Sequence, residues 1–204
     1  MTRRLFLASP AALAAEAPRD DYPVLLQHAE RAIPRFLEQP IRPDPDMGFA
    51  DYRAAVSAVH YLLTLYSTRA SRYFRDAAVL TALHEAIRFL ASQQNPNGTI
   101  DLGFTNFDSP PDTGFAVRSL LPAYRIYRAA FGSDNPLGDS EAALRRFFLK
   151  GCDSMVEGGI HTPNHRWVVA AALAEAHTVF GEERYRRRAE EWLREGIDVT
   201  PEGE

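Results

Sequence analysis

Cysteine and lysine are almost missing from this chain of 204 residues. The single cysteine, Cys152, excludes an internal disulfide and any metal site built from several thiolates. All but one of the 23 basic residues are arginine, the exception being Lys150. The guanidinium group of arginine binds carboxylate ligands better than a lysine does, because it can donate two parallel hydrogen bonds. The 27 acidic residues leave a net charge of -4, which excludes the broad basic field of a nucleic-acid-binding protein.

Three kinds of sequence pattern are also missing. No alternating run predicts a long strand, and no apolar run is long enough to span a bilayer. No phosphate loop, dinucleotide fingerprint or nucleophile elbow is found. What is present is an ordinary globular composition, with 46% apolar and 25% charged residues, in a chain of single-domain length.

Residues 1–17 have the pattern of an export signal. Arg3 and Arg4 precede a short apolar run, and small residues then offer Ala-x-Ala cleavage sites. The order Arg-Arg-Leu-Phe-Leu resembles a twin-arginine signal, and a frayed N-terminal helix is the alternative. We therefore expect a periplasmic or secreted protein whose folded domain comprises residues 18–204.

Helical periodicity is frequent in that domain. The apolar spacing predicts helices over residues 22–38, 49–66, 75–92, 113–131, 141–150, 165–180 and 182–195. From residue 49 onward, helices that are apolar almost all round alternate with helices that carry one apolar stripe. The first kind must be covered on several sides, whereas the second faces solvent, so the alternation predicts an all-α fold of helical hairpins in two layers.

A short motif precedes each broadly apolar helix. Residues 45–50 read PDMGFA, residues 111–116 read PDTGFA, and residues 163–168 read PNHRWV. In each copy Asp or Asn follows the proline, and an aromatic residue comes three positions later. Because Asp and Asn side chains accept hydrogen bonds from free backbone amides, we interpret each as the N-cap of an inner helix.

The hairpin length predicts a larger ring than this chain supplies. Hairpins of about 50 to 65 residues would need roughly 300 to 400 residues to close a six-hairpin ring. Residues 18–204 hold about three hairpins and a leading helix. We therefore expect an incomplete α/α toroid. Either the remainder of the ring is missing from this chain, or the fold is an open arc whose end helices are covered by something else.

Two polar loops lead into predicted inner helices and would meet at one mouth of the ring. The first carries Asn106 and Asp112, and the second carries His161 and the run Asn164-His165-Arg166-Trp167. That run places an amide donor, a titratable imidazole and a permanent cation at one helix start, where free amides favour an anionic group. Aromatic residues suited to stacking on sugar rings lie nearby: Phe104, Phe107, Phe115 and Trp167. From these loops we take as substrate contacts Asn106, Asp112, His161 and Trp167.

Each candidate also has a structural interpretation. Asp112 is better suited to a helix cap than to an acid, and Asn164 can be a plain N-cap. Arg166 can pair with a carboxylate, and His165 can make a structural hydrogen bond. Asn106 can simply shape its loop.

The histidines do not predict a metal site. His161 and His165 have the four-residue spacing of zinc ligands, but Pro163 places His161 outside the helix, and no third ligand is in view. Four other histidines are interpreted as structural: His28, His60, His84 and His177. We therefore expect neither a metal nor a cofactor.

The two polar loops resemble a known family. Residues 106–115, NFDSPPDTGF, and residues 159–167, GIHTPNHRW, resemble bacterial heparinase II/III-like proteins of the alginate lyase and six-hairpin toroid group. The resemblance covers residues 20–204 and corresponds to the N-terminal helical part of such proteins. Characterised relatives add a C-terminal β-sandwich domain, which this chain lacks, and they cleave acidic polysaccharides by β-elimination.

The resemblance implies a polysaccharide lyase whose partner is an acidic, uronate-containing polysaccharide or oligosaccharide. It places Asn164 and Arg166 on the substrate carboxylate and His165 as neutraliser or base, and the family's catalytic tyrosine has no assigned counterpart here. One alternative is a glycoside hydrolase on the same toroid, which would pair Asp112 with Asp46 or Asp101. The other is a non-catalytic carbohydrate-binding or scaffold toroid, or an inactive fragment of an enzyme.

Overall fold

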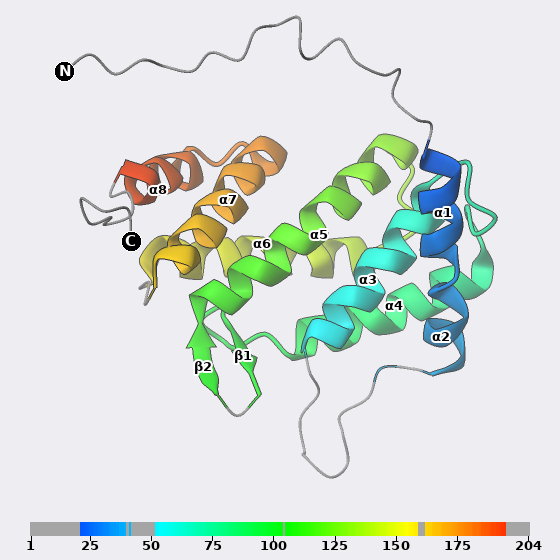
Figure 1. Ribbon diagram of the computed structural model, residues 1–204, viewed down its shortest axis with the longest axis horizontal. Helices are drawn as coiled ribbons and strands as arrows, with labels where there is room; N and C mark the ends of the chain where they lie inside the picture. The colour runs from blue at the N-terminus through cyan, green and yellow to red at the C-terminus, as the bar shows by residue number, and fades with distance from the viewer. Residues whose placement is uncertain (1–20, 40, 42–51, 104, 159–161, 195–204) are drawn as a thin grey trace, which may run out of the picture.

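The protein is all-α, as the sequence predicted (Figure 1). The computed structural model describes residues 21–39, 41, 52–103, 105–158 and 162–194, so the predicted export signal lies outside it. In this part of the chain the elements are α1 (Tyr22–Glu30), α2 (Ile33–Glu38), α3 (Tyr52–Ser67), α4 (Ala77–Ser92), β1 (Ile100–Leu102), β2 (Asn106–Ser109), α5 (Pro110–Phe131), α6 (Asp139–Glu157), α7 (Pro163–Phe180) and α8 (Glu183–Arg194). None of these helices is both long and apolar enough to cross a lipid bilayer.

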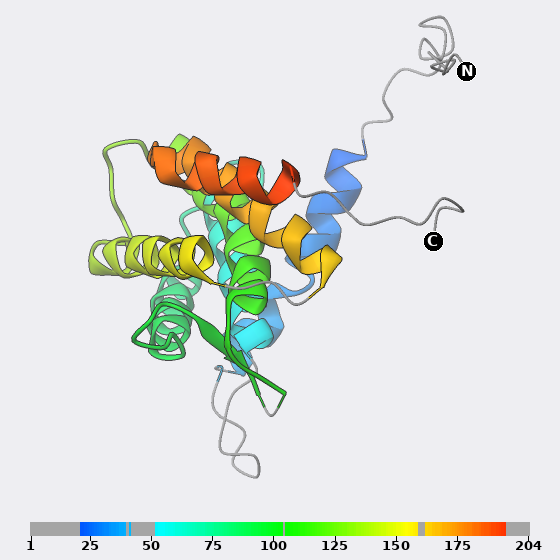
Figure 2. The ribbon, with the colours of Figure 1, turned by 90° about the vertical axis from the view of Figure 1, so that its left-hand side faces the viewer.

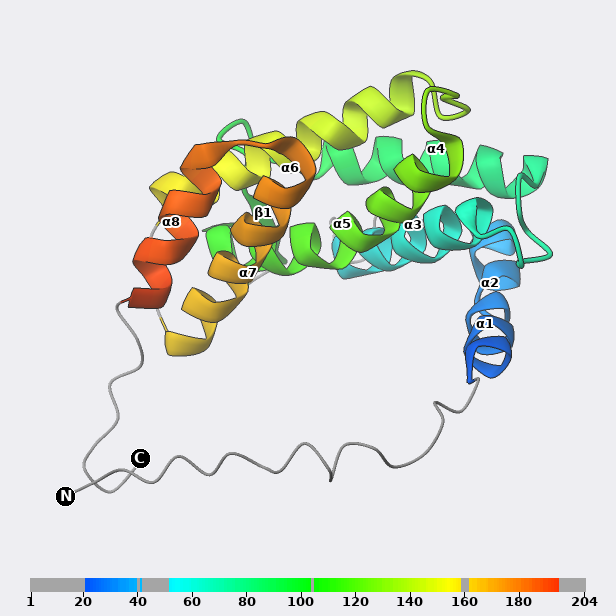
Figure 3. The ribbon, with the colours of Figure 1, turned by 90° about the horizontal axis from the view of Figure 1, so that it is seen from above.

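The helices form the predicted two layers. α3, α5 and α7 lie side by side, with α5 in contact with both neighbours. α4, α6 and α8 each pack against the inner helix that precedes them, and α6 also contacts α4 and α8. Figure 3 shows these two rows from above, and in Figure 1 the inner helices all run in the same direction. Their N-terminal ends therefore lie on one side of the inner layer, the side that carries β1 and β2.

Burial explains why the two layers differ in composition. α3 is covered by neighbours and buries side chains on every turn, among them Val56, Val59 and Leu63. α8 buries one stripe, formed by Tyr185, Ala189 and Trp192. Fully burying an apolar side chain contributes about 1.5–3 kcal/mol, so the inner row supplies most of the stabilisation.

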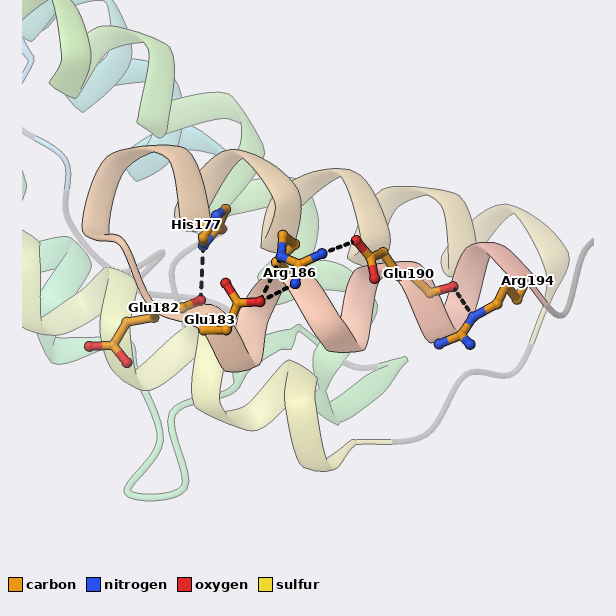
Figure 4. Close-up of polar contacts among 6 residues, drawn as sticks. All are labelled: His177, Glu182, Glu183, Arg186, Glu190 and Arg194. Atoms are coloured by element: carbon orange, nitrogen blue, oxygen red, sulfur yellow. Dashed lines mark hydrogen bonds and ion pairs between the residues drawn. The ribbon is translucent and has the colours of Figure 1, made fainter.

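The back of α8 is a charged surface, as the sequence predicted. Arg186 forms ion pairs with Glu183 and Glu190, which lie about one turn away on either side (Figure 4). At the turn into this helix, Nδ1 of His177 is 3.2 Å from the carbonyl oxygen of Glu182. Exposed pairs of this kind add little stability, so the buried stripe holds α8 in place.

Two predicted helices differ clearly from the structure in their bounds. The leading helix is broken into α1 and α2, because Pro34, in the first turn of α2, has no backbone N–H to donate to the carbonyl of Glu30 four residues earlier. α6 continues to Glu157 instead of ending at residue 150, since Gly151 is buried against α5. A Cβ at Gly151 would lie 3.0 Å from Cγ2 of Thr113, so the glycine permits the two helices to approach closely.

A small hairpin occupies part of a segment expected to be loop. β1 and β2 pair antiparallel and lead directly into α5 (Figure 2). The loop before β1 is tied to α6, because Nε2 of Gln94 donates to the carbonyl oxygens of Gly98 and Phe147, both at 2.9 Å. The hairpin therefore fixes the entry of the chain into α5, where two predicted site residues lie.

The cysteine is part of the core. Cys152 is a free thiol with no exposed surface. Burial raises the pKa of the Cys152 thiol well above its ordinary value, with a further rise from Asp153. A thiol that stays protonated and covered is chemically inert, so this cysteine is a core residue.

Candidate functional site

At the N-terminus of α5, the side chain of the N-cap and that of the third helical residue are hydrogen-bonded to each other. Ser109 is the N-cap, and its Oγ accepts a hydrogen bond from the backbone nitrogen of Asp112 at 3.3 Å. The same hydroxyl donates to Oδ2 of Asp112 at 2.5 Å. The reciprocal contacts form a variant of the capping box, in which the third helical residue reaches back to the N-cap.

The carboxylate of Asp112 also joins three elements. The hydroxyl of Tyr52, at the start of α3, donates to Oδ1 at 3.0 Å. Nδ2 of Asn106, at the start of β2, donates to Oδ2 at 3.1 Å. Tyr52 and Asp112 are both buried, so this cluster ties the first turns of α3 and α5 to the hairpin.

The N-terminus of α7 is different. Its N-cap is Thr162, whose side chain accepts no capping hydrogen bond. The hydroxyl of Thr162 instead donates to Oδ1 of Asn164, which is the second residue of the helix and is exposed. This contact occupies the amide oxygen of Asn164 and leaves its NH2 group directed to other acceptors.

His165 and Arg166 follow in the same turn, and both are partly buried. In the described part of the chain, Nδ1 of His165 is buried and has no hydrogen-bond partner. A buried polar atom without a partner costs about 1–3 kcal/mol, and in native proteins such atoms call for an explanation. One such explanation is that the atom forms its hydrogen bond to a bound ligand.

Three exposed aromatic side chains lie on the elements of these two helix starts. The exposed fraction is 67% for Phe107 on β2, 44% for Phe115 on α5 and 51% for Trp167 on α7. Phe107 and the aromatic residues of both described motif copies are thus available for stacking on an apolar face of a ligand. Phe104 lies outside the described residues.

Beside the Asp112 cluster, residues of α3 and α5 line a groove with a volume of about 570 Å³. Its polar lining includes Tyr52, Asp112 and His60. Its apolar lining includes Val56 and Ala116. The groove lies within the size range of small-ligand sites, about 300–1,000 Å³.

Farther along the inner layer, α5 and α7 share a charged pair. Oε1 of Glu175 lies 3.9 Å from Nη1 of Arg125. Burial raises the pKa of Glu175, while Arg125 and Arg118 lower it in part. The carboxylate of Glu175 is therefore partly buried, whereas the side chain of Arg125 is more than half exposed.

The structure confirms where the inner helices start but corrects the caps. α5 and α7 begin at their motif copies, yet the N-caps are Ser109 and Thr162, while Asp112 and Asn164 lie inside the helices. The hydroxyl residues precede the prolines, and proline suits the first helical turn, where it loses no hydrogen bond. The first copy, residues 45–50, lies outside the described residues.

Asn106 and Asp112 are brought together, as described above, whereas Asn164, His165, Arg166 and Trp167 share the first turns of α7. His161 lies outside the described residues. Tyr52 was missed by the sequence analysis. A tyrosine in the first turn of an apolar helix needs a partner for its buried hydroxyl, and this was the signal that could have singled it out.

The carboxylates offered for a hydrolase already have structural partners. Asp112 has the contacts given above, and Oδ1 of Asp101 accepts from Nδ2 of Asn95 at 2.8 Å and from the backbone nitrogen of Asp108 at 2.7 Å. Asp46 lies outside the described residues. In the part of the chain that the structure describes, no three His, Cys, Asp or Glu side chains cluster in a way that could hold a metal ion.

Comparison with models of protein families, with curated proteins and with solved structures finds no match to this chain.

Proposed function

We propose that this protein is a polysaccharide lyase that acts on a uronate-containing chain, with its reaction centre at the first turn of α7. The observation that supports this proposal most strongly is the buried and unpartnered Nδ1 of His165, next to the exposed Asn164. The proposed setting is outside the cytoplasm, in a periplasm or in the medium.

The chemistry requires two things that this turn offers. A proton next to a carboxylate becomes acidic enough to remove only when the negative charge of the carboxylate is neutralised. Asn164 donates from its amide group and Arg166 supplies a positive charge, and such donors also stabilise the enolate-like transition state. His165 acts as a further neutraliser or as the base.

In the elimination, every bond that breaks is matched by a bond that forms. The base takes the proton from the carbon next to the carboxylate, and the electron pair of that C–H bond becomes the new C=C bond. The C–O bond to the next sugar breaks, and the leaving oxygen takes a proton from an acid. The products are one unsaturated uronate end and one new reducing end.

Trp167 and Phe115 support a carbohydrate ligand in particular. Both are large aromatic side chains that remain about half exposed near the starts of adjacent inner helices. Sugar rings combine apolar C–H faces with polar edges, so they fit sites that pair aromatic faces with a few polar groups.

The test is a depolymerisation assay of the complete gene product that contains this chain, on a panel of uronate polysaccharides. Ultraviolet absorbance of unsaturated products and new reducing ends are followed in parallel. We expect both signals to rise together and to fall about 100- to 10,000-fold in His165→Ala, the range for loss of a general base. His28→Ala, the same change on the exposed surface of α1, is the matched control.

Two results would contradict the proposal. Reducing ends without absorbance would show hydrolysis, and no product from any uronate polymer would favour a non-catalytic carbohydrate-binding role. Activity that survives in His165→Ala would remove the reaction centre from α7.

A further inference from the structure

The groove between α3 and α5 contains a histidine that the proposed reaction does not use. His60, on α3, lines the groove, and its Nδ1 lies 2.7 Å from the carbonyl oxygen of Ser119 on α5. A carbonyl oxygen can only accept, so Nδ1 carries the hydrogen. In the neutral ring, Nε2 is then the acceptor.

The sequence of α5 explains why the carbonyl of Ser119 is available. Pro122 lies inside this helix, has no backbone N–H, and leaves the carbonyl of Arg118 without its usual partner. A carbonyl oxygen has two lone pairs, so one in this turn can accept a further hydrogen bond from a neighbouring helix. The next carbonyl, that of Ser119, takes the hydrogen bond from His60 and links the two inner helices.

The neighbours of His60 give the groove two kinds of surface. The ring of Tyr61 stands edge-on to the imidazole, with centroids 5.7 Å apart and an interplanar angle of 82°. Phe115 is 44% exposed on the opposite helix, above a floor that includes Val56 and Ala116. The groove therefore offers apolar faces together with the polar groups of His60 and Ser57.

We propose that this groove is a sugar-ring subsite of the same uronate chain, in which Nε2 of His60 accepts a hydrogen bond from a sugar hydroxyl. This inference rests on the proposed function and adds a second contact region to it. Phe115 covers the apolar face of the ring, and Arg53 also lines the groove. His60 is a binding residue here and takes no part in the elimination.

The position of the groove sets the size of the ligand. α5 lies between α3 and α7, and packed helices are about 8–10 Å apart. A ligand that reaches both His60 and the first turn of α7 must cross the width of α5. A single sugar is too small for this, whereas an oligosaccharide is long enough.

The test compares galacturonate with tetragalacturonate by titration calorimetry, for the wild-type chain and for His60→Asn. The asparagine amide can still donate to the carbonyl of Ser119, but it has no group at the position of Nε2. We expect tetragalacturonate to bind about 3- to 10-fold more weakly to His60→Asn, the effect of one net hydrogen bond. His60→Gln, which places a polar group near the position of Nε2, is expected to recover part of the affinity.

The controls separate this inference from the proposed function. His28→Asn makes the same substitution on exposed α1 and is expected to bind like the wild type. Wild-type binding of tetragalacturonate that is unchanged in the folded His60→Asn variant would overturn the subsite alone. A wild-type chain that binds neither ligand would overturn the groove as a galacturonate subsite, whereas the lyase proposal is decided by the depolymerisation panel. An equal weakening for galacturonate and tetragalacturonate would overturn the assignment of His60 to a distant subsite.

Discussion

The first turns of α5 and α7 begin with closely similar sequence and differ in their chemistry. At the third residue of α5, the carboxylate of Asp112 is held by the side chains of Ser109, Tyr52 and Asn106. At the third residue of α7, Nδ1 of His165 is buried without a partner in the described part of the chain. The polar side chain at one helix start is fully paired within the protein, whereas a buried ring nitrogen at the other has no partner among the described residues.

The two helix starts also differ in their number of prolines. Two prolines, Pro110 and Pro111, follow the N-cap of α5 and place the acidic residue of the motif third in the helix, where it can reach back to the N-cap. A single proline follows the N-cap of α7, so Asn164 is second. Successive helical residues point about 100° apart, so the shift by one position turns Asn164 outward.

After His165→Ala, the largest effect expected from this comparison is the loss of activity in Asn164→Ala. Removing an amide that stabilises developing charge is expected to lower kcat/KM on a uronate polymer about 100- to 1,000-fold. The thermal midpoint should stay near the wild-type value, because the side chain is exposed and its described contact is with Thr162 next to it. A large loss of stability in this variant would break the distinction between the two helix starts.

Asp112→Ala is expected to show the opposite pattern. The hydroxyls of Tyr52 and Ser109 would lose a buried acceptor, and the free energy of unfolding should fall by about 2–3 kcal/mol in urea titrations. Asp134→Ala, which breaks an exposed pair with Arg75, is the matched control and should change stability by less than about 1 kcal/mol. A folded Asp112→Ala protein of normal stability that has lost all activity would instead make Asp112 a reacting group.

The sequence was sufficient to predict the layers, because burial on several sides requires an apolar composition along the whole helix. α3 and α8 illustrate this, one covered by neighbours and the other charged on its back. The hairpin β1–β2 was not predicted, since its strands are too short for alternation to be visible. Its geometry depends on contacts such as that of Gln94 with α6, which lies far along the chain.

The candidate site was only partly predictable. The polar residues at the helix starts could be listed from their spacing, but which of them are satisfied depends on partners from other elements. Tyr52 lies 60 residues before Asp112, and no local pattern joins them. His60 was interpreted as structural from its place in a helix, and its bond to Ser119 agrees with this, yet the groove around it comes from the packing of α3 against α5.

The smallest predicted effect tests the hydrogen bond between α3 and α5. Tyr52→Phe removes only the hydroxyl that donates to Oδ1 of Asp112, so we expect a loss of about 1 kcal/mol in the free energy of unfolding. Tyr22→Phe, at an exposed position of α1, is the matched control and should have almost no effect. In a double-mutant cycle with Asp112→Ala, the two losses should not add, because both variants break the same hydrogen bond. Additive losses would mean that the cluster does not join α3 to α5, and the saturated helix start would then be held from within α5 and β2 alone.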